Sequence, residues 1–219
     1  MRFPVITLLL VCLVHAVTAV AQGATDYNAL HGVFKASSAV AGFDRLLAIP
    51  KIQSKNPAVA ANSISIVIRS RNGDIQVPID SQGRAAFPLS EALVAENPRV
   101  VSNQPSGSLR VSLVVEVKPP AQVRVTYAEL AQAMADVEAA MRKLGEGYAS
   151  GAIEGLEFRF DSTAGAQMSI SASDHEELLM ADPSGRVFLR REGSARSSDS
   201  IVAFSAPPRQ VLPRVAKQP

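Results

Sequence analysis

The residues best suited to chemistry stand together at positions 174–177, where Asp174, His175, Glu176 and Glu177 follow one another. Carboxylates and an imidazole can bind metal ions and transfer protons. Neighbouring residues on a strand or turn point in different directions, however, and do not converge easily on one ion. We interpret the cluster as a solvated turn. Metal binding, and an envelope hydrolase that uses His175 with Asp174 and Glu176, are the weaker alternatives.

Other catalytic patterns are incomplete in this chain. The G-x-S-x-G nucleophile elbow is absent, and the glycines after residue 144 match no nucleotide-binding loop. Glu154, Glu157 and Asp161 could supply the two carboxylates of a glycosidase. Around Glu157, Arg159 and Asp161, alternation with apolar residues instead predicts the wet face of a strand. The sequence therefore favours a protein that is not an enzyme and needs no cofactor.

The first 21 residues have the pattern of a cleaved secretory signal. Arg2 precedes an apolar run that ends in the small-residue triplet Ala19-Val20-Ala21, so we expect cleavage after Ala21. The only cysteine, Cys12, lies inside this segment, which leaves no thiol in the mature chain. We predict a periplasmic or secreted protein of the bacterial envelope, with no stable transmembrane segment after cleavage.

Composition excludes several classes of partner. The 219 residues are 47% hydrophobic and 19% charged, which is typical of a folded chain rather than a disordered or multispanning one. Without Arg2, 21 basic residues face 20 acidic ones, so no polyanion partner is implied. Because aromatic residues make up 5% and tryptophan is absent, surfaces that stack on nucleic acid are disfavoured too. We expect no nucleic-acid partner.

Alternating residues predict a mainly β fold. Ile64 to Ile79 forms a hairpin around Asn72-Gly73, and 109–117 is the clearest strand. Ser90 begins a short helix that stops at Asn97. Further strands are expected near 156–160, 168–172, 187–190 and 201–204. The segment 22–62 stays open, with a strand at 33–35 and a helix at 39–48 as candidates.

One long amphipathic helix is expected over about 126–145. Thr126 and Glu129 form a capping box, and Gly145 is a C-terminal cap. Apolar residues then recur at steps of three and four, which favours packing on a sheet. The same spacing permits a coiled-coil seam, so weak self-association through 127–144 is an alternative.

The two halves of the chain echo each other at an offset of 102 residues. The shared kernel is Asp-x-x-Gly-Arg, at Asp80 to Arg84 and again at Asp182 to Arg186. A hairpin turn whose aspartate accepts backbone hydrogen bonds explains the kernel without a repeat. The alternative is two related modules.

The first copy of the kernel lies within the stretch 77–87, which follows Asn72-Gly73 and ends at Phe87-Pro88. This stretch resembles the hairpin of transthyretin-like, carboxypeptidase-regulatory-type β-sandwich modules. The resemblance implies an accessory or binding module rather than a catalyst. The long helix departs from that fold.

We therefore predict a mainly β (α+β) protein of one or two small antiparallel β-sandwich-like modules, with the helix packed on the second. The boundaries are 22–118, 123–205 and a flexible proline-rich tail over 206–219. The tail offers these partner-binding candidates: Pro207, Pro208, Arg209, Pro213 and Arg214. The predicted function is an exported, non-catalytic interaction or accessory module whose partner is an unknown envelope protein. A periplasmic carrier of a small ligand and the envelope hydrolase are the alternatives.

Overall fold

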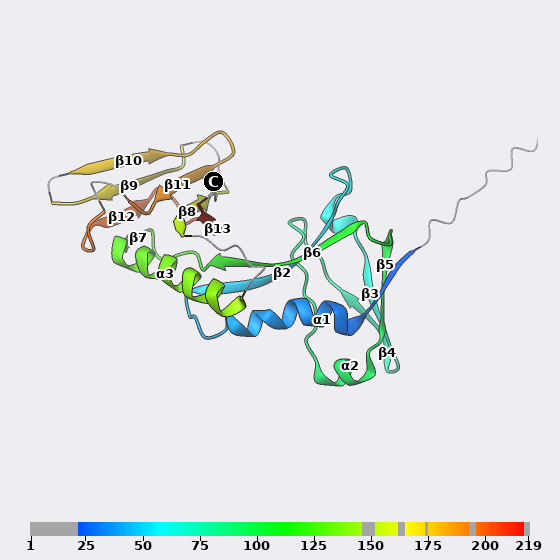
Figure 1. The fold of residues 1–219 in the computed structure, drawn as a ribbon. Helices are drawn as coiled ribbons and strands as arrows, with labels where there is room; N and C mark the ends of the chain where they lie inside the picture. The colour runs from blue at the N-terminus through cyan, green and yellow to red at the C-terminus, as the bar shows by residue number, and fades with distance from the viewer. Residues whose placement is uncertain (1–21, 146–151, 162–164, 174, 193–195, 217–219) are drawn as a thin grey trace, which may run out of the picture.

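The computed structural model describes residues 22–145, 152–161, 165–173, 175–192 and 196–216. Three antiparallel sheets account for most of the regular structure, with 43% strand and 22% helix (Figure 1). The predicted mainly β fold class is confirmed. The predicted signal peptide, 1–21, lies outside the described residues.

The elements follow one another in this order: β1 (Gln22–Asp26), α1 (Tyr27–Lys35), a 3-10 turn (Ala36–Ala39), β2 (Leu46–Ser54), a second 3-10 turn (Ala61–Ser63), β3 (Ile66–Ser70), β4 (Gly73–Val77), α2 (Glu91–Glu96), β5 (Arg99–Pro105), β6 (Leu109–Val117), β7 (Arg124–Thr126), α3 (Tyr127–Leu144), β8 (Ile153–Arg159), β9 (Gln167–Ser171), β10 (Glu176–Met180), β11 (Arg186–Arg190), β12 (Ile201–Phe204) and β13 (Gln210–Val215).

Two of the sheets have the same topology. The first has the strand order β1-β5-β3-β4, and the second has the order β7-β12-β9-β10, in which each strand holds the same place in its half of the chain. A helix directly follows the first strand in both halves. We call 22–118 the first repeat and 123–216 the second repeat. The connector 119–122 separates them.

The pairing registers of the two repeats agree as well. In the first repeat Ile68 lies opposite Val100 across β3 and β5. Ile170 and Val202, each 102 positions later, lie opposite each other across β9 and β12. The register of the β3–β4 hairpin recurs at the same offset in β9–β10. Of the two explanations that the sequence left open, the structure therefore supports the internal repeat.

The Asp-x-x-Gly-Arg kernel forms the same turn in both repeats. In each copy the aspartate Oδ1 accepts hydrogen bonds from the backbone N–H groups two and four residues later, and the glycine adopts a positive φ. The first copy contains Asp80, Gln82, Gly83 (φ +81°) and Arg84, and the second contains Asp182, Ser184, Gly185 (φ +74°) and Arg186, with N···O distances of 2.8–3.1 Å.

The third sheet joins the repeats. Its order is β11-β8-β13-β6-β2, with β2 and β6 from the first repeat and the other three strands from the second. The β2–β6 pair is nine residues long on each strand and passes between two hydrophobic cores (Figure 1). Leu46 and Val117, at one end, belong to the core of the second repeat, whereas Ile52 belongs to the core of the first.

Helix α3 forms as the sequence predicts and packs on the second repeat. Both hydrogen bonds of the Thr126–Glu129 capping box are present. Its apolar stripe, which includes Leu130, Met134 and Val137, is buried in the core of the second repeat. The alternative of self-association through 127–144 would need this stripe, which the chain's own sheets cover.

The prediction of a flexible tail is also wrong. Residues 210–215 form β13, which lies between β8 and β6 in the third sheet. An extended proline-containing segment can join a sheet where few ladder bonds are needed. Accordingly, β13 pairs with β6 only through Val211 and Val117, and Pro213 has no N–H to offer. The second repeat thus extends to residue 216.

The open segment and the first hairpin need correction in detail. Neither candidate for 22–62 is right: 33–35 lies in helix α1, and 39–48 passes from a 3-10 turn into β2. The predicted β3–β4 hairpin is confirmed, but Gly73 alone has a positive φ (+117°), and Asn72 does not. The long β2–β6 pairing outweighs the local helical pattern of 39–48.

Candidate functional site: the groove between β10 and β11

The structure separates the residues of the 174–177 cluster. His175 and Glu176 are exposed where the β9–β10 turn enters β10, and Asp174 lies outside the described residues. Glu177 lies on the opposite face of β10 from Glu176 and pairs with Arg196 at 2.9 Å. In the part of the chain that the structure describes, no three His, Cys, Asp or Glu side chains are grouped to hold a metal ion. In the described part of the chain, no convergent catalytic set forms around His175.

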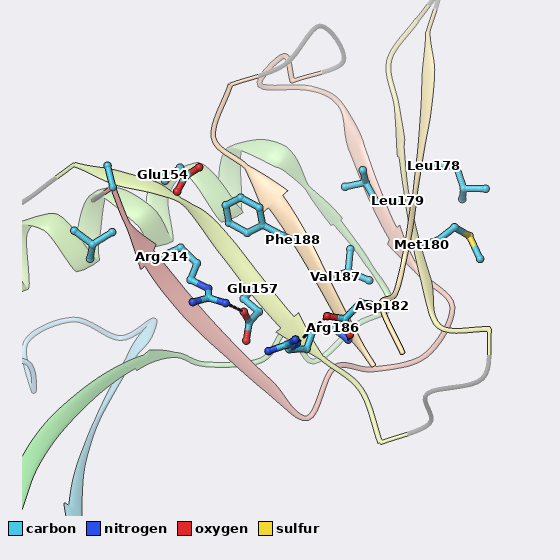
Figure 2. A pocket seen from close by; sticks show the side chains of 12 residues that line it. Glu154, Glu157, Leu178, Leu179, Met180, Asp182, Arg186, Val187, Phe188 and Arg214 are labelled. Atoms are coloured by element: carbon cyan, nitrogen blue, oxygen red, sulfur yellow. Dashed lines mark hydrogen bonds and ion pairs between the residues drawn. The ribbon is translucent and has the colours of Figure 1, made fainter. Parts of the chain in front are cut away.

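A groove of about 1030 Å³ lies instead between β10 and β11, which follow each other in sequence but belong to different sheets (Figure 2). Apolar and charged side chains both line it: Leu178, Leu179, Met180, Val187 and Phe188, with Glu154, Glu157, Asp182, Arg186 and Arg214. Leu178 and Met180 are 56% and 59% exposed. Isolated apolar side chains on a surface are common, but two on one free strand edge mark a candidate contact.

The free edge of β10 presents unused backbone groups. Antiparallel strands alternate between hydrogen-bonded and non-hydrogen-bonded residue pairs. Two bonds fix the alternation between β9 and β10: Ala172 N–H donates to His175 O at 2.8 Å, and Ala181 N–H donates to Ala166 O at 2.9 Å. By this alternation the N–H and C=O groups of Leu178 and Met180 point away from β9, at the edge of the sheet that β10 forms.

The edge of β11 is arranged in the same way. Its alternation with β8 is fixed by two further bonds, from Phe160 N–H to Gly185 O at 3.0 Å and from Arg191 N–H to Glu154 O at 2.8 Å. The backbone groups of Arg186, Phe188 and Arg190 therefore point away from β8. Those of Arg186 are used by Asp182, whereas Phe188 has no backbone bond across the groove among the described residues.

The first repeat closes the equivalent gap. There the N–H of Ala86 donates to Pro78 O at 3.0 Å, and Ile79 forms a bridge with Ala85. No such bond joins the equivalent Phe188 and Met180 in the described chain. Three equivalent positions along this gap differ between the repeats: they hold Gln76, Pro78 and Ala86 in the first repeat, and Leu178, Met180 and Phe188 in the second. The open groove thus comes with larger apolar side chains that the repeated fold itself does not require.

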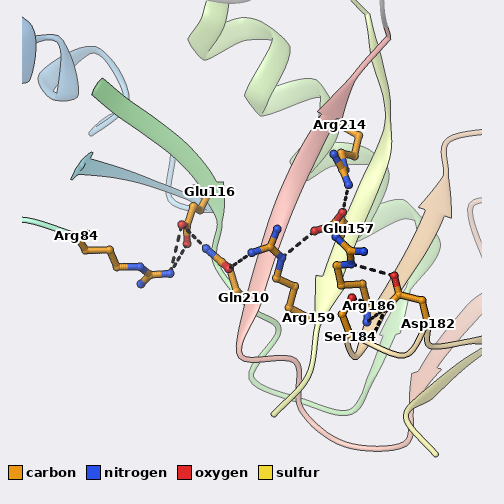
Figure 3. A network of polar contacts seen from close by, with 9 residues as sticks. All are labelled: Arg84, Glu116, Glu157, Arg159, Asp182, Ser184, Arg186, Gln210 and Arg214. Atoms are coloured by element: carbon orange, nitrogen blue, oxygen red, sulfur yellow. Dashed lines mark hydrogen bonds and ion pairs between the residues drawn. The ribbon is translucent and has the colours of Figure 1, made fainter. Parts of the chain in front are cut away.

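The floor of the groove continues into a buried polar network that crosses between the repeats (Figure 3). Glu157, whose side chain is 3% exposed, accepts hydrogen bonds from Arg159 (2.7 Å) and Arg214. Glu116 on β6 accepts from Arg84 (2.9 Å) and from Gln210 on β13 (2.5 Å). A hydrogen bond of 3.4 Å from Arg159 to Gln210 connects the Glu157 part of the network with the Glu116 part. Each buried carboxylate is thereby satisfied.

These carboxylates correct the prediction from the sequence. Glu157 was expected on the wet face of a strand, but it is 3% exposed, and Glu116 on β6 is 5% exposed. The strand alternation is right, but the second face of β6 and β8 is covered by arginine and glutamine side chains. Glu157 therefore cannot serve as a free carboxylate of a glycosidase, since two arginines hold it.

Asp182 holds the turn at one end of the groove. The Ser184 hydroxyl donates to its Oδ1 at 2.7 Å, and Arg186 donates through its backbone N–H and its Nε. These bonds, the hydroxyl's first, hold the pKa of the Asp182 carboxyl well below its usual range. The turn between β10 and β11 therefore stays charged and ordered at any pH near neutral.

Of the predicted partner-binding residues, Arg214 alone lines the groove. Pro213 is its neighbour in β13, Pro208 is buried, and Pro207 and Arg209 are exposed outside the groove.

Comparison of the chain with protein-family models, curated proteins and solved structures finds no match. Among the described residues, no helix has the length and apolar character needed to cross a bilayer.

Proposed function

We propose that the protein is an exported, non-catalytic interaction module of the bacterial cell envelope, and that it binds an extended segment of a partner protein in the β10–β11 groove. The observation that carries this proposal is the free edge of β10, which joins unused backbone groups to the exposed side chains of Leu178 and Met180. Strand addition uses both features, because the main chain supplies affinity and alternate side chains supply specificity.

The groove also suggests the chemistry of the bound segment. Leu178 and Met180 point to one side of β10, while Leu179 points toward β11 (Figure 2). Residues of an added strand that point to the same side as Leu178 and Met180 would cover these two side chains. Arg186 and Arg214 are 43% and 53% exposed at the groove. We therefore expect alternating apolar residues with an acidic residue or a terminal carboxylate nearby.

Export and the envelope location rest on the sequence pattern of 1–21. The transthyretin-like resemblance of the first hairpin remains a prediction, and its implication of an accessory or binding module agrees with this proposal. The hydrolase alternative gains no support from the placement of His175.

The decisive experiment places a photo-crosslinking amino acid at Leu178 in cells that make the protein. Leu89 provides the matched control position, because it is a leucine of similar exposure (48%) outside the groove. We expect a crosslinked partner from position 178 and none from 89. Mass spectrometry should place the crosslink in an extended, alternating segment, and a synthetic peptide of that segment should slow amide exchange of Leu178 and Phe188.

The variant Met180→Pro tests the strand-addition geometry. The Met180 N–H points away from β9, so proline there removes an edge donor without breaking the ladder to β9, as Pro78 does in the first repeat. We expect Met180→Pro to abolish the crosslink and Met180→Leu to retain it, both with nearly native melting temperatures. Equal crosslinking from 178 and 89, crosslinking to a second copy of this chain, or an undiminished crosslink in Met180→Pro would overturn the proposal.

A further inference from the structure

The first repeat contains a largely apolar cavity of about 290 Å³ that is separate from the groove and opens to solvent beside Pro105, Ser106 and Gly107. It lies among β1, β3 and β5, the start of α1, and the β2–β6 pair. Its buried walls include Ile52, Ile66 and Val100, and Ser102 is its most buried polar residue at 6% exposure. We infer that this cavity is a binding site for a small, uncharged, largely apolar molecule with one hydrogen-bond acceptor.

The second repeat shows how the same place is filled when no ligand is needed. Ser102 lies opposite Ile66, and at the same register Phe204 lies opposite Met168. The Phe204 ring packs in the second core, with its centroid 5.1 Å from that of Phe158. A serine at this position in one repeat and a buried phenylalanine in the other leaves the first repeat short of one aromatic ring.

The other aromatic residues do not compensate for the missing ring. The first core has three large aromatic side chains beside α1: Tyr27 stacks on Phe87, and Phe34 packs against Phe87 at a tilt. Of these three, none lines the cavity. An unfilled apolar space forfeits dispersion contacts along its walls, and a ligand of matching shape restores them.

The lining defines the ligand's chemistry. None of the cavity's lining residues is charged, so a charged group in its interior would lose hydration without compensation. The Ser102 hydroxyl accepts from Gln104 N–H at 3.0 Å and donates to no acceptor among the described residues. Its proton can therefore bond a carbonyl, ether or hydroxyl oxygen. An apolar cavity of about 150 Å³ holds benzene, so this one has room for a chain of about eight carbon atoms.

The experiment uses 1-octanol as the probe and the whole protein labelled at isoleucine δ1-methyl groups. We expect saturable shifts of the Ile52 and Ile66 methyl signals and none at Ile170 in the second repeat. At 100 times the dissociation constant, octanol should raise the melting temperature by about 5–10 °C.

Ser102→Phe places the ring of the second repeat in the cavity and should abolish both effects. Ser169→Phe adds the same ring on β9, away from the cavity, and should leave both unchanged. Ser102→Leu, a smaller filling, should weaken binding at least tenfold, and it serves if the phenylalanine variant does not fold. Absence of saturable shifts at Ile52 and Ile66, or undiminished octanol binding in the filled variants, would overturn the inference. Neither result bears on the β10–β11 groove.

Discussion

The buried network beneath the groove makes a quantitative prediction for Glu157→Gln. Glu157 is 3% exposed and holds two arginines, Arg159 at 2.7 Å and Arg214. A hydrogen bond to a charged group contributes about 1.5–3 kcal/mol. Glutamine keeps the volume and one acceptor oxygen, but it turns an N–H₂ toward a guanidinium.

Solvent reduces the expected loss. Arg214 is 53% exposed and Arg159 34%, so both can regain hydration when the carboxylate is removed. We therefore expect a loss of about 2 kcal/mol, below the 3–5 kcal/mol of a fully buried pair. For a chain of this size that corresponds to a fall in melting temperature of about 4–8 °C.

Glu154→Gln is the matched control, because Glu154 lies three residues earlier on β8 and also pairs with an arginine. That pair spans 3.7 Å, and its side chains are 43% and 69% exposed. An exposed pair of this kind contributes less than about 0.5 kcal/mol. Urea unfolding followed by far-ultraviolet circular dichroism measures both variants. If Glu157→Gln and Glu154→Gln lose the same stability, burial of the carboxylate is not what makes the network stabilising.

Three further predictions follow from individual positions. Gly155→Ala should destabilise the protein by at least about 2 kcal/mol, because the added Cβ would stand 2.1 Å from the Leu189 carbonyl oxygen. In the control Gly32→Ala the added Cβ meets no atom within 4 Å, so this variant should stabilise helix α1 by about 0.5–1 kcal/mol. Urea unfolding measures the stability of both variants. The lowered pKa of Asp182 gives a contribution to stability that is present above the unfolded pKa of about 3.9 and is lost as the pH falls through the folded value. The stability difference between wild type and Asp182→Asn should therefore be constant from pH 7 to 5 and shrink below about pH 4, and a difference that stays constant in acid would contradict this assignment. His175→Ala should change neither the melting temperature nor the crosslink from position 178, because the imidazole is exposed at a turn; loss of the crosslink would show that the turn contacts the partner.

Local patterns in the sequence predicted the elements that form by local rules. The capping box at Thr126 and the period of the following residues were enough to place α3. The alternation over 109–117 gave β6 with its observed bounds. Strand β10 was missed because its first two residues, Glu176 and Glu177, interrupt any apolar alternation.

Long-range pairing could not be predicted in the same way. Nothing local distinguishes a proline-rich strand that closes a sheet from a free tail, so β13 depended on its partner β8, more than fifty residues away in sequence. The buried carboxylates share this limit. Glu116 and Glu157 have the alternation of solvated residues, but β13 brings Gln210 and Arg214 to them, in addition to Arg84 and Arg159.

Because the chain contains an internal repeat, its two halves can be compared with each other. Two halves with the same strand order and the same registers need similar residues wherever folding alone decides, as at the aspartates of the two kernel turns. Where one half departs from the other without a change in backbone pairing, folding does not explain the difference. Two departures stand out: the serine that replaces a core phenylalanine in the first repeat at an unchanged pairing register, and the apolar edge of the second repeat, where a backbone bond of the first repeat is absent. Because they lie in different repeats and change opposite properties, one affecting a core and the other a surface, the proposed ligand site and the proposed strand-binding groove rest on independent observations.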